Sequence, residues 1–79
     1  MKLRFFGRLR DALGTGEVDV DVPSDITDSD TLRTWLGRTY PALLDPSVRL
    51  ALDDEMVAAD PRPLGAAREA AFLPPVSGG

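Results

Sequence analysis

The last nine residues, "AFLPPVSGG", are the part of the sequence whose residue types and order point most directly to chemistry. Ser77 is small and the two glycines after it have no side chain beyond hydrogen, so this end of the chain could pass through a channel too narrow for most side chains. The carboxylate of Gly79 would then be presented deep inside a partner. An inert, frayed end is the alternative interpretation of the same residues.

Two prolines precede this end of the chain. Pro74 and Pro75 have no amide hydrogen with which to pair in a sheet, and both favour an extended polyproline conformation. We therefore expect residues 1–73 to form the folded domain and residues 74–79 to form a flexible tail directed away from it. The tail should become ordered only on a partner, since it can bury too little surface to offset its conformational entropy.

The composition excludes most kinds of catalytic site. The chain has 79 residues, no Cys and no His. Catalytic Cys, Ser-His pairs, His general bases, disulfides and thiolate or imidazole metal sites are therefore ruled out. We expect no self-contained enzyme, no metal site and no bound cofactor.

Charge and hydropathy limit the partners and the location. The net charge of -4 argues against nucleic acid and anionic membranes, both of which attract clustered Lys and Arg, and favours a partner with a basic docking face. No apolar run approaches the ~20 residues that span a bilayer, and "MKLRFF" is not a signal-peptide pattern. We therefore expect a cytoplasmic protein.

The first half of the chain predicts two strands and a helix. Alternation predicts strands over residues 2–6 and 17–22, with Val18, Val20 and Val22 on one buried face, and the glycine-bounded segment between these strands predicts a short helical turn. The two strands should pair in antiparallel fashion because their connection is short. N-cap candidates around Asp28 and apolar residues at helical spacing predict a helix over residues 30–39, with Pro41 as its terminator and Leu32, Trp35 and Leu36 in the core.

The second half predicts a hairpin and a last strand. "VRLAL" alternates, a turn follows at residues 53–55, and "EAAFL" is the last segment able to form a strand. A mixed sheet with one main helix packed on one face fits this order of elements, with a crossover through the helix to a parallel neighbouring strand. This is an α+β fold of the β-grasp, or ubiquitin-like, kind.

The whole chain resembles the small subunit of molybdopterin synthase, a ubiquitin-like sulfur carrier. The segments that carry the resemblance are "KLRFFGRLRDALG", "TLRTWL", "LALDDEMV" and above all "AFLPPVSGG". Two departures stand out: Asp53 replaces an Asn that is common in the family, and "GAARE" replaces an Asp-Gly-Asp-like turn before the last strand.

The resemblance implies a function in molybdenum cofactor biosynthesis. A ubiquitin-activating-like adenylyltransferase would use ATP to adenylate Gly79, and a sulfur donor would convert it to a thiocarboxylate. The tail, Pro74, Pro75, Val76, Ser77, Gly78 and Gly79, would then enter the large synthase subunit and give sulfur to a pyranopterin precursor. The family suggests a heterotetramer of two small and two large subunits, with catalytic side chains on the partners.

Three residues of the domain are candidates for docking to these partners. Phe6 lies on the strand face opposite Leu3 and Phe5, Leu73 lies just before the prolines, and Arg10 matches a basic residue of the family motif. Structural roles remain open for all three: a small apolar cluster for Phe6, ordinary core for Leu73 and a solvated surface position for Arg10.

Three other functions remain open for the chain. The first is a sulfur carrier for thiamine synthesis, cysteine synthesis or tRNA thiolation. The second is a ubiquitin-like modifier joined to lysines through Gly79. The third is an interaction domain with an inert tail.

Overall fold

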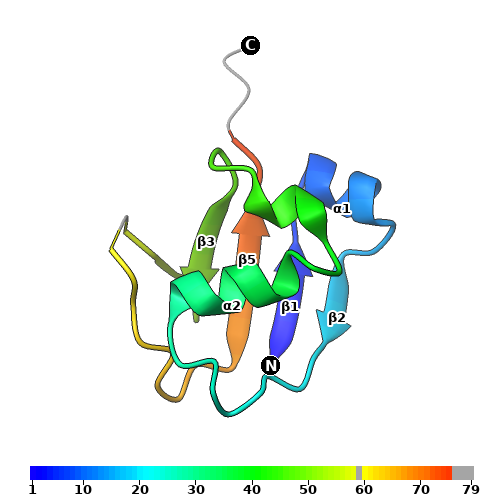
Figure 1. The fold of residues 1–79 in the computed structure, drawn as a ribbon. Coiled ribbons are helices and arrows are strands. Elements are labelled where there is room, and N and C mark those ends of the chain that lie inside the picture. The colour runs from blue at the N-terminus through cyan, green and yellow to red at the C-terminus, as the bar shows by residue number, and fades with distance from the viewer. Residues whose placement is uncertain (59, 76–79) are drawn as a thin grey trace.

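The computed structural model describes residues 1–58 and 60–75 of the chain. Its elements are β1 (Lys2–Phe5), α1 (Arg8–Leu13), β2 (Glu17–Asp19), α2 (Ser29–Leu36), the 3₁₀ helix η1 (Pro41–Leu44), β3 (Arg49–Leu52), β4 (Glu55–Met56) and β5 (Glu69–Leu73). The strands form one sheet in the order β2-β1-β5-β3-β4, and α2 crosses one face of it (Figure 1). The predicted β-grasp fold is confirmed. Among the described residues, no helix has the length and apolar character needed to cross a bilayer.

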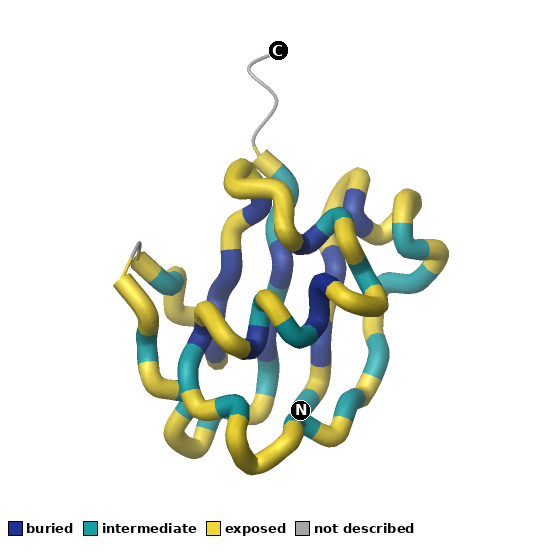
Figure 2. The backbone as a smooth tube through the Cα atoms, in the orientation of Figure 1, coloured by how far each residue is buried: buried dark blue, intermediate teal, exposed yellow. Residues whose placement is uncertain are grey.

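The core lies between the sheet and α2. Alternate residues of β1 and β5 are buried, as are Leu50, Ala51 and Leu52 of β3, and the buried side chains on the helix side of the sheet face Leu32 and Leu36, as the dark segments of Figure 2 show. Leu32 and Leu36 were predicted to be core residues and are. Trp35 is only half-buried, because it sits on the flank of α2, beside Pro23 and Ile26, and packs against the edge of the core.

The crossover through α2 reaches a parallel strand, as predicted, but that strand is not the neighbour of β2. β5 pairs in parallel with β1 and in antiparallel fashion with β3. The strand that follows α2, β3, therefore runs in the same direction as β2 but is not its neighbour, because β1 and β5 lie between them. The parallel neighbours are the first and last strands of the chain.

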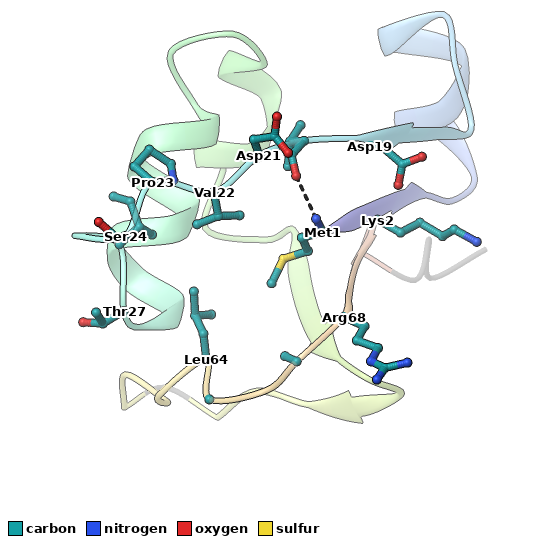
Figure 3. Close-up of a pocket in the computed structure, with 14 residues that line it drawn as sticks. Met1, Lys2, Asp19, Asp21, Val22, Pro23, Ser24, Thr27, Leu64 and Arg68 are labelled. Atoms are coloured by element: carbon teal, nitrogen blue, oxygen red, sulfur yellow. Dashed lines mark hydrogen bonds between the residues drawn. The ribbon is translucent and has the colours of Figure 1, made fainter.

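β2 is shorter than the predicted strand of residues 17–22. It pairs with β1 in antiparallel fashion as expected, with Val18 opposite Leu3, but it ends at Asp19, the register partner of Lys2, which is the first residue of β1. The Met1 ammonium donates to the carbonyl of Val20 at 2.7 Å, which is the last contact along this edge (Figure 3). The predicted valines, Val18, Val20 and Val22, are half-buried rather than buried, because β2 is the edge strand of the sheet.

α2 begins and ends close to the predicted positions. Asp28 is its N-cap, and the helix ends at Leu36 with Gly37 as the C-cap, although Gly37 was predicted to lie inside the helix. A methyl group on Gly37 would collide with the side chain of Leu44, so the glycine lets η1 pack closely after the helix. Pro41 starts η1, an element that was not predicted from the sequence.

A single arginine ties this connection to the helix. Arg33 of α2 donates hydrogen bonds to the carbonyl oxygens of Leu43, Asp45 and Val48, the latter two at 2.6 Å. A guanidinium group can satisfy several acceptors at once because it holds five N–H donors in a fixed plane. Arg33 therefore fixes the path from η1 into β3.

The turn between β3 and β4 also holds the start of β5. Asp53 and Asp54 both have positive φ angles, 46° and 68°, as a two-residue hairpin turn of type I′ requires. Glu55, predicted to be part of the turn, begins β4. One carboxylate oxygen of Asp53 accepts from the amides of Arg68 and Glu69, both at 3.0 Å. An Asn at this position could accept the same bonds through its side-chain carbonyl.

We expect Asp28→Ala to lower the Tm at pH 7 and to have little effect in acid. The Asp28 carboxylate accepts from the backbone amide of Thr31 at 2.8 Å, and this bond holds the pKa of Asp28 below its ordinary value. A carboxyl group with a lowered folded-state pKa stabilises the fold fully above about pH 4 and loses this effect as the pH falls through the folded-state pKa.

The measurement is thermal unfolding followed by circular dichroism between neutral pH and about pH 2. The Tm values of the original chain and of Asp28→Ala should converge at the acid end. Asp28→Asn is the matched control, because it keeps an acceptor for Thr31 and cannot titrate. A difference in Tm between the original chain and Asp28→Ala that stays constant across the whole pH range would contradict the prediction.

Candidate functional site

The root of the tail lies at one end of the central strand. Leu73 is the last residue of β5; Pro74 is half-buried and Pro75 is exposed. Because β5 is parallel to β1, the chain leaves the sheet at the end where β1 leads into α1 (Figure 1). Val76, Ser77, Gly78 and Gly79 lie outside the described residues, so their roles stay predictions.

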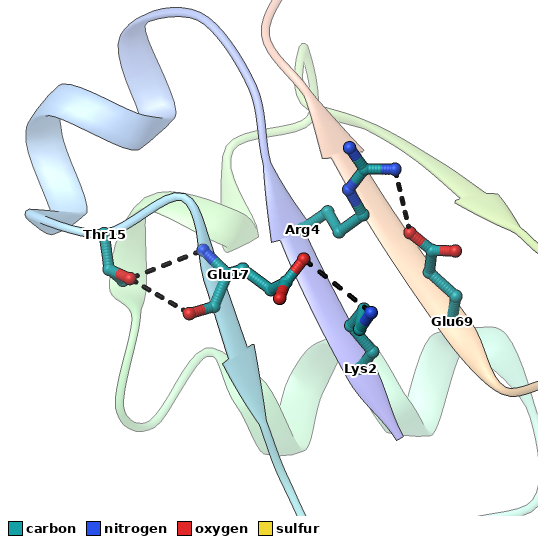
Figure 4. Close-up of polar contacts among 5 residues, drawn as sticks. All are labelled: Lys2, Arg4, Thr15, Glu17 and Glu69. Carbon is teal, nitrogen blue, oxygen red and sulfur yellow. Dashed lines mark hydrogen bonds and ion pairs between the residues drawn. The ribbon is translucent and has the colours of Figure 1, made fainter.

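The face of the sheet turned away from α2 is open. Figure 4 shows charged side chains on this face: Arg4 forms an ion pair with Glu69 at 3.2 Å, and Lys2 lies 3.9 Å from Glu17. All four side chains are partly exposed, and ion pairs of this kind contribute little to stability. These weak ion pairs can therefore be exchanged for contacts with another protein.

Phe6 and Leu73, predicted separately as docking residues, lie next to each other on this face. Phe5 pairs with Phe72, so the residues that follow them are neighbours on adjacent strands. Phe6 is 37% exposed, and the guanidinium carbon of Arg4 lies 5.1 Å from the centroid of its ring. On the other side, Arg49 of β3 is the register partner of Leu73. We call these four residues, Arg4, Phe6, Arg49 and Leu73, the arginine-flanked patch.

Small apolar residues lie between this patch and β4 on the same face: Ala71 is half-buried and Ala51 is buried. Ala71 lies opposite Arg4 on one side and opposite Ala51 on the other, and Ala51 pairs with Met56, which is 51% exposed. Arg49, Ala51 and Met56 were not predicted to be docking residues from the sequence. Alternation along each strand indicated which residues face outward, but only the strand order places them beside Leu73 and Ala71.

Arg10 is not part of this patch. It lies on α1, and its side chain is folded against Gly16, with Nε about 3.0 Å from where a methyl group on that glycine would be. This contact ties α1 to the segment that enters β2. The structure thus gives Arg10 a packing role, and its docking role stays a prediction.

A hollow lies at the opposite end of the sheet from the tail. Figure 3 shows it between the segment that joins β2 to α2 and the loop before β5, with Met1 and Leu64 on its walls. Its rim carries charges of both signs, Lys2 and Arg68 with Asp19 and Asp21. Within residues 1–58 and 60–75, no three Asp or Glu side chains gather as metal ligands.

Comparison with known proteins gives matches over nearly the whole chain. The family described as "ThiS family" matches residues 3–79. A crystal structure of SAMP1 from Haloferax volcanii matches with a TM-score of 0.70 and 29% identity, covering 100% of this chain and 98% of that one. A crystal structure of small archaeal modifier protein 1 from the same organism matches with a TM-score of 0.67 and 28% identity, covering 96% and 97%.

Proposed function

The chain belongs to the ThiS family of ubiquitin-like sulfur carriers, and from this premise we propose that it carries sulfur as a thiocarboxylate on Gly79. The observation that supports the proposal is the position of β5. This strand is paired on both sides in the middle of the sheet and ends at Leu73, directly before Pro-Pro-Val-Ser-Gly-Gly. A rigid strand of this kind gives a narrow chain end a fixed point of departure.

The chemistry takes place at the terminal carboxyl group. A carboxylate is a poor electrophile, so one of its oxygens first attacks the α-phosphate of ATP on an activating enzyme, and pyrophosphate leaves. A hydrosulfide donor then attacks the carbonyl carbon of the acyl-adenylate; AMP leaves, and a thiocarboxylate and a proton are formed. Two easier steps thus replace one difficult substitution. The activating enzyme supplies the catalytic groups, since this chain has neither Cys nor His.

Within this family we propose molybdopterin synthesis as the pathway. A bare Gly-Gly end is common to many ubiquitin-like proteins and does not distinguish between pathways. The residues before it, an aromatic residue, two prolines and Val-Ser, support this assignment. The partners would be the large synthase subunit, in a heterotetramer of two small and two large subunits, and an adenylyltransferase. Sulfur delivery to thiamine synthesis, to cysteine synthesis or to tRNA thiolation remains an alternative.

A second candidate function is protein modification. It is favoured by the likeness to small archaeal modifier protein 1, whose name describes a modifier. The same acyl-adenylate would serve both functions, because a lysine amine can attack the activated carbonyl in place of sulfur. The product would then be an isopeptide bond at Gly79.

The arginine-flanked patch is the proposed docking surface for these partners. Phe6 is exposed and Leu73 is half-buried next to the root of the tail, and Arg4 and Arg49 lie on either side of them. Although the net charge of -4 favoured a basic partner surface, the local charge around this patch favours acidic groups opposite the arginines.

The test is intact-mass spectrometry of the full chain after incubation with ATP, sulfide and an adenylyltransferase of this family. We expect one oxygen at Gly79 to be replaced by sulfur, and the loaded chain to convert a pyranopterin precursor when the large subunit is added. The control omits ATP and should show no change in mass. A chain that stays unloaded with several such enzymes would contradict the carrier function, and isopeptide conjugates in cell extracts would favour the modifier.

A further inference from the structure

Gly7 joins β1 to α1 in a conformation that suits glycine. Its φ and ψ angles are 54° and −130°, and the amide of Leu9 donates to the carbonyl of Phe6 at 3.1 Å. These values describe a type II′ turn with Gly7 at its first central position, where residues with a Cβ atom are disfavoured. The turn directs the chain from the sheet into α1.

The same glycine lies against the root of the tail. A methyl group on Gly7 would be 2.9 Å from Cγ of Pro74 and 3.6 Å from Cδ. The shorter distance is below any ordinary carbon–carbon contact. Apart from a change in ring pucker, a proline ring moves only together with its backbone, because the ring closes on the backbone nitrogen and fixes the φ angle. A side chain at position 7 would therefore displace the backbone at Pro74.

This contact occurs where the pairing of β1 and β5 ends. The amide of Phe6 donates to the carbonyl of Phe72 at 3.1 Å. The parallel ladder would next require the amide of residue 74 to donate to Phe6, but proline has no amide hydrogen. The carbonyl of Phe6 accepts from Leu9 instead. Beyond Leu73 the contact between the Pro74 ring and Gly7 takes the place of the ladder.

We propose that Gly7 is a positioning residue that sets the direction in which the tail leaves the domain. This inference rests on the proposed function, because the direction of the tail matters for bringing Gly79 to the activating enzyme. Gly7 touches no reacting atom and acts through Pro74. Its absent side chain lets the proline ring rest on the turn, so the tail starts from one defined orientation.

The test is a double-mutant cycle with the full-length chain, using Gly7→Ala, Pro74→Ala and the combined variant. The readout is ATP–pyrophosphate exchange by the adenylyltransferase at several carrier concentrations. We expect Gly7→Ala to lower kcat by about tenfold, because small errors in the placement of a reacting group have large effects on rate. KM should change little, since the arginine-flanked patch is intact. The double variant should be no slower than the slower single variant, because both changes disrupt one contact.

A matched control separates backbone strain from the contact with Pro74. Gly65 has the same φ angle as Gly7, 54°, but a methyl group there would meet nothing within 4 Å. Gly65→Ala should lower the Tm and leave the exchange rate unchanged. In a synthetic chain, D-alanine at position 7 accepts a positive φ and places its methyl group on the other side of Cα, so we expect it to restore kcat.

Two results would overturn the inference: an unchanged kcat for Gly7→Ala, or single-variant effects that multiply in the double variant. If the original chain is not loaded either, that result counts against the proposed function and not against the role of Gly7. A readout that does not depend on activity then tests the role of Gly7. The chain has no cysteine, so Ser77→Cys accepts one spin label. Gly7→Ala should change which amide signals of the domain this label broadens, and an identical pattern would overturn the positioning role.

Discussion

Removal of Gly79 should abolish sulfur loading and leave the fold unchanged. The shortened chain still ends in a carboxylate, so the chemical group is retained and only its reach is altered. One residue of extended chain spans at most about 3.6 Å. Nucleophilic attack requires reacting atoms within about 3.5 Å, so a deficit of one residue moves the carboxylate out of range of the α-phosphate.

The measurement pairs intact-mass spectrometry with thermal unfolding. The truncated chain should show no thiocarboxylate under conditions that load the full chain, and the two Tm values should agree, since the core is formed by residues up to Phe72. Gly79→Ala is the matched control for length, because it keeps the reach and adds one methyl group. Equal loading of the truncated and full chains would refute the carrier function.

Phe72→Ala should destabilise the domain by about 3–5 kcal/mol. Phe72 has no exposed surface and lies on the central strand, opposite Phe5 on one side and Leu50 on the other. The centroids of the Phe5 and Phe72 rings are 6.1 Å apart. Small domains have a total stability near the low end of about 5–15 kcal/mol, so this single change removes most of it.

Urea unfolding followed by circular dichroism measures this effect at 25 °C. Phe72→Leu is the control, because it keeps most of the buried volume and should cost much less than the alanine variant. A fall of less than about 1 kcal/mol for Phe72→Ala would mean that the core around β5 can close over the cavity.

The strands and their buried faces could be predicted from alternation, but their lengths could not. Val18, Val20 and Val22 alternate with acidic residues as a strand should, yet β2 ends at Asp19. The reason lies in β1, which begins at Lys2: Val20 exchanges hydrogen bonds with Met1, but Val22 has no register partner in β1. A strand's own sequence does not specify how far its neighbour extends.

The candidate site was predictable only in part, for a related reason. Phe6 and Leu73 could be selected one at a time, from an outward-facing position and from proximity to the prolines. Arg49 joins them only because β3 is the neighbour of β5. Gly7 looks like any turn glycine in the sequence, and its contact with Pro74 depends on the parallel pairing of the two ends of the chain.

The central position of the last strand also affects how the protein matures. β5 completes the sheet by pairing with β1 and β3, and its partner β1 lies at the other end of the chain. During synthesis β1 emerges from the ribosome well before β5, so these long-range contacts form only once β5 has been made, and such contacts make folding slow. A nascent or prematurely terminated chain therefore lacks both the completed sheet and Gly79. Formation of the complete sheet and synthesis of the tail therefore depend on the same final stretch of the chain.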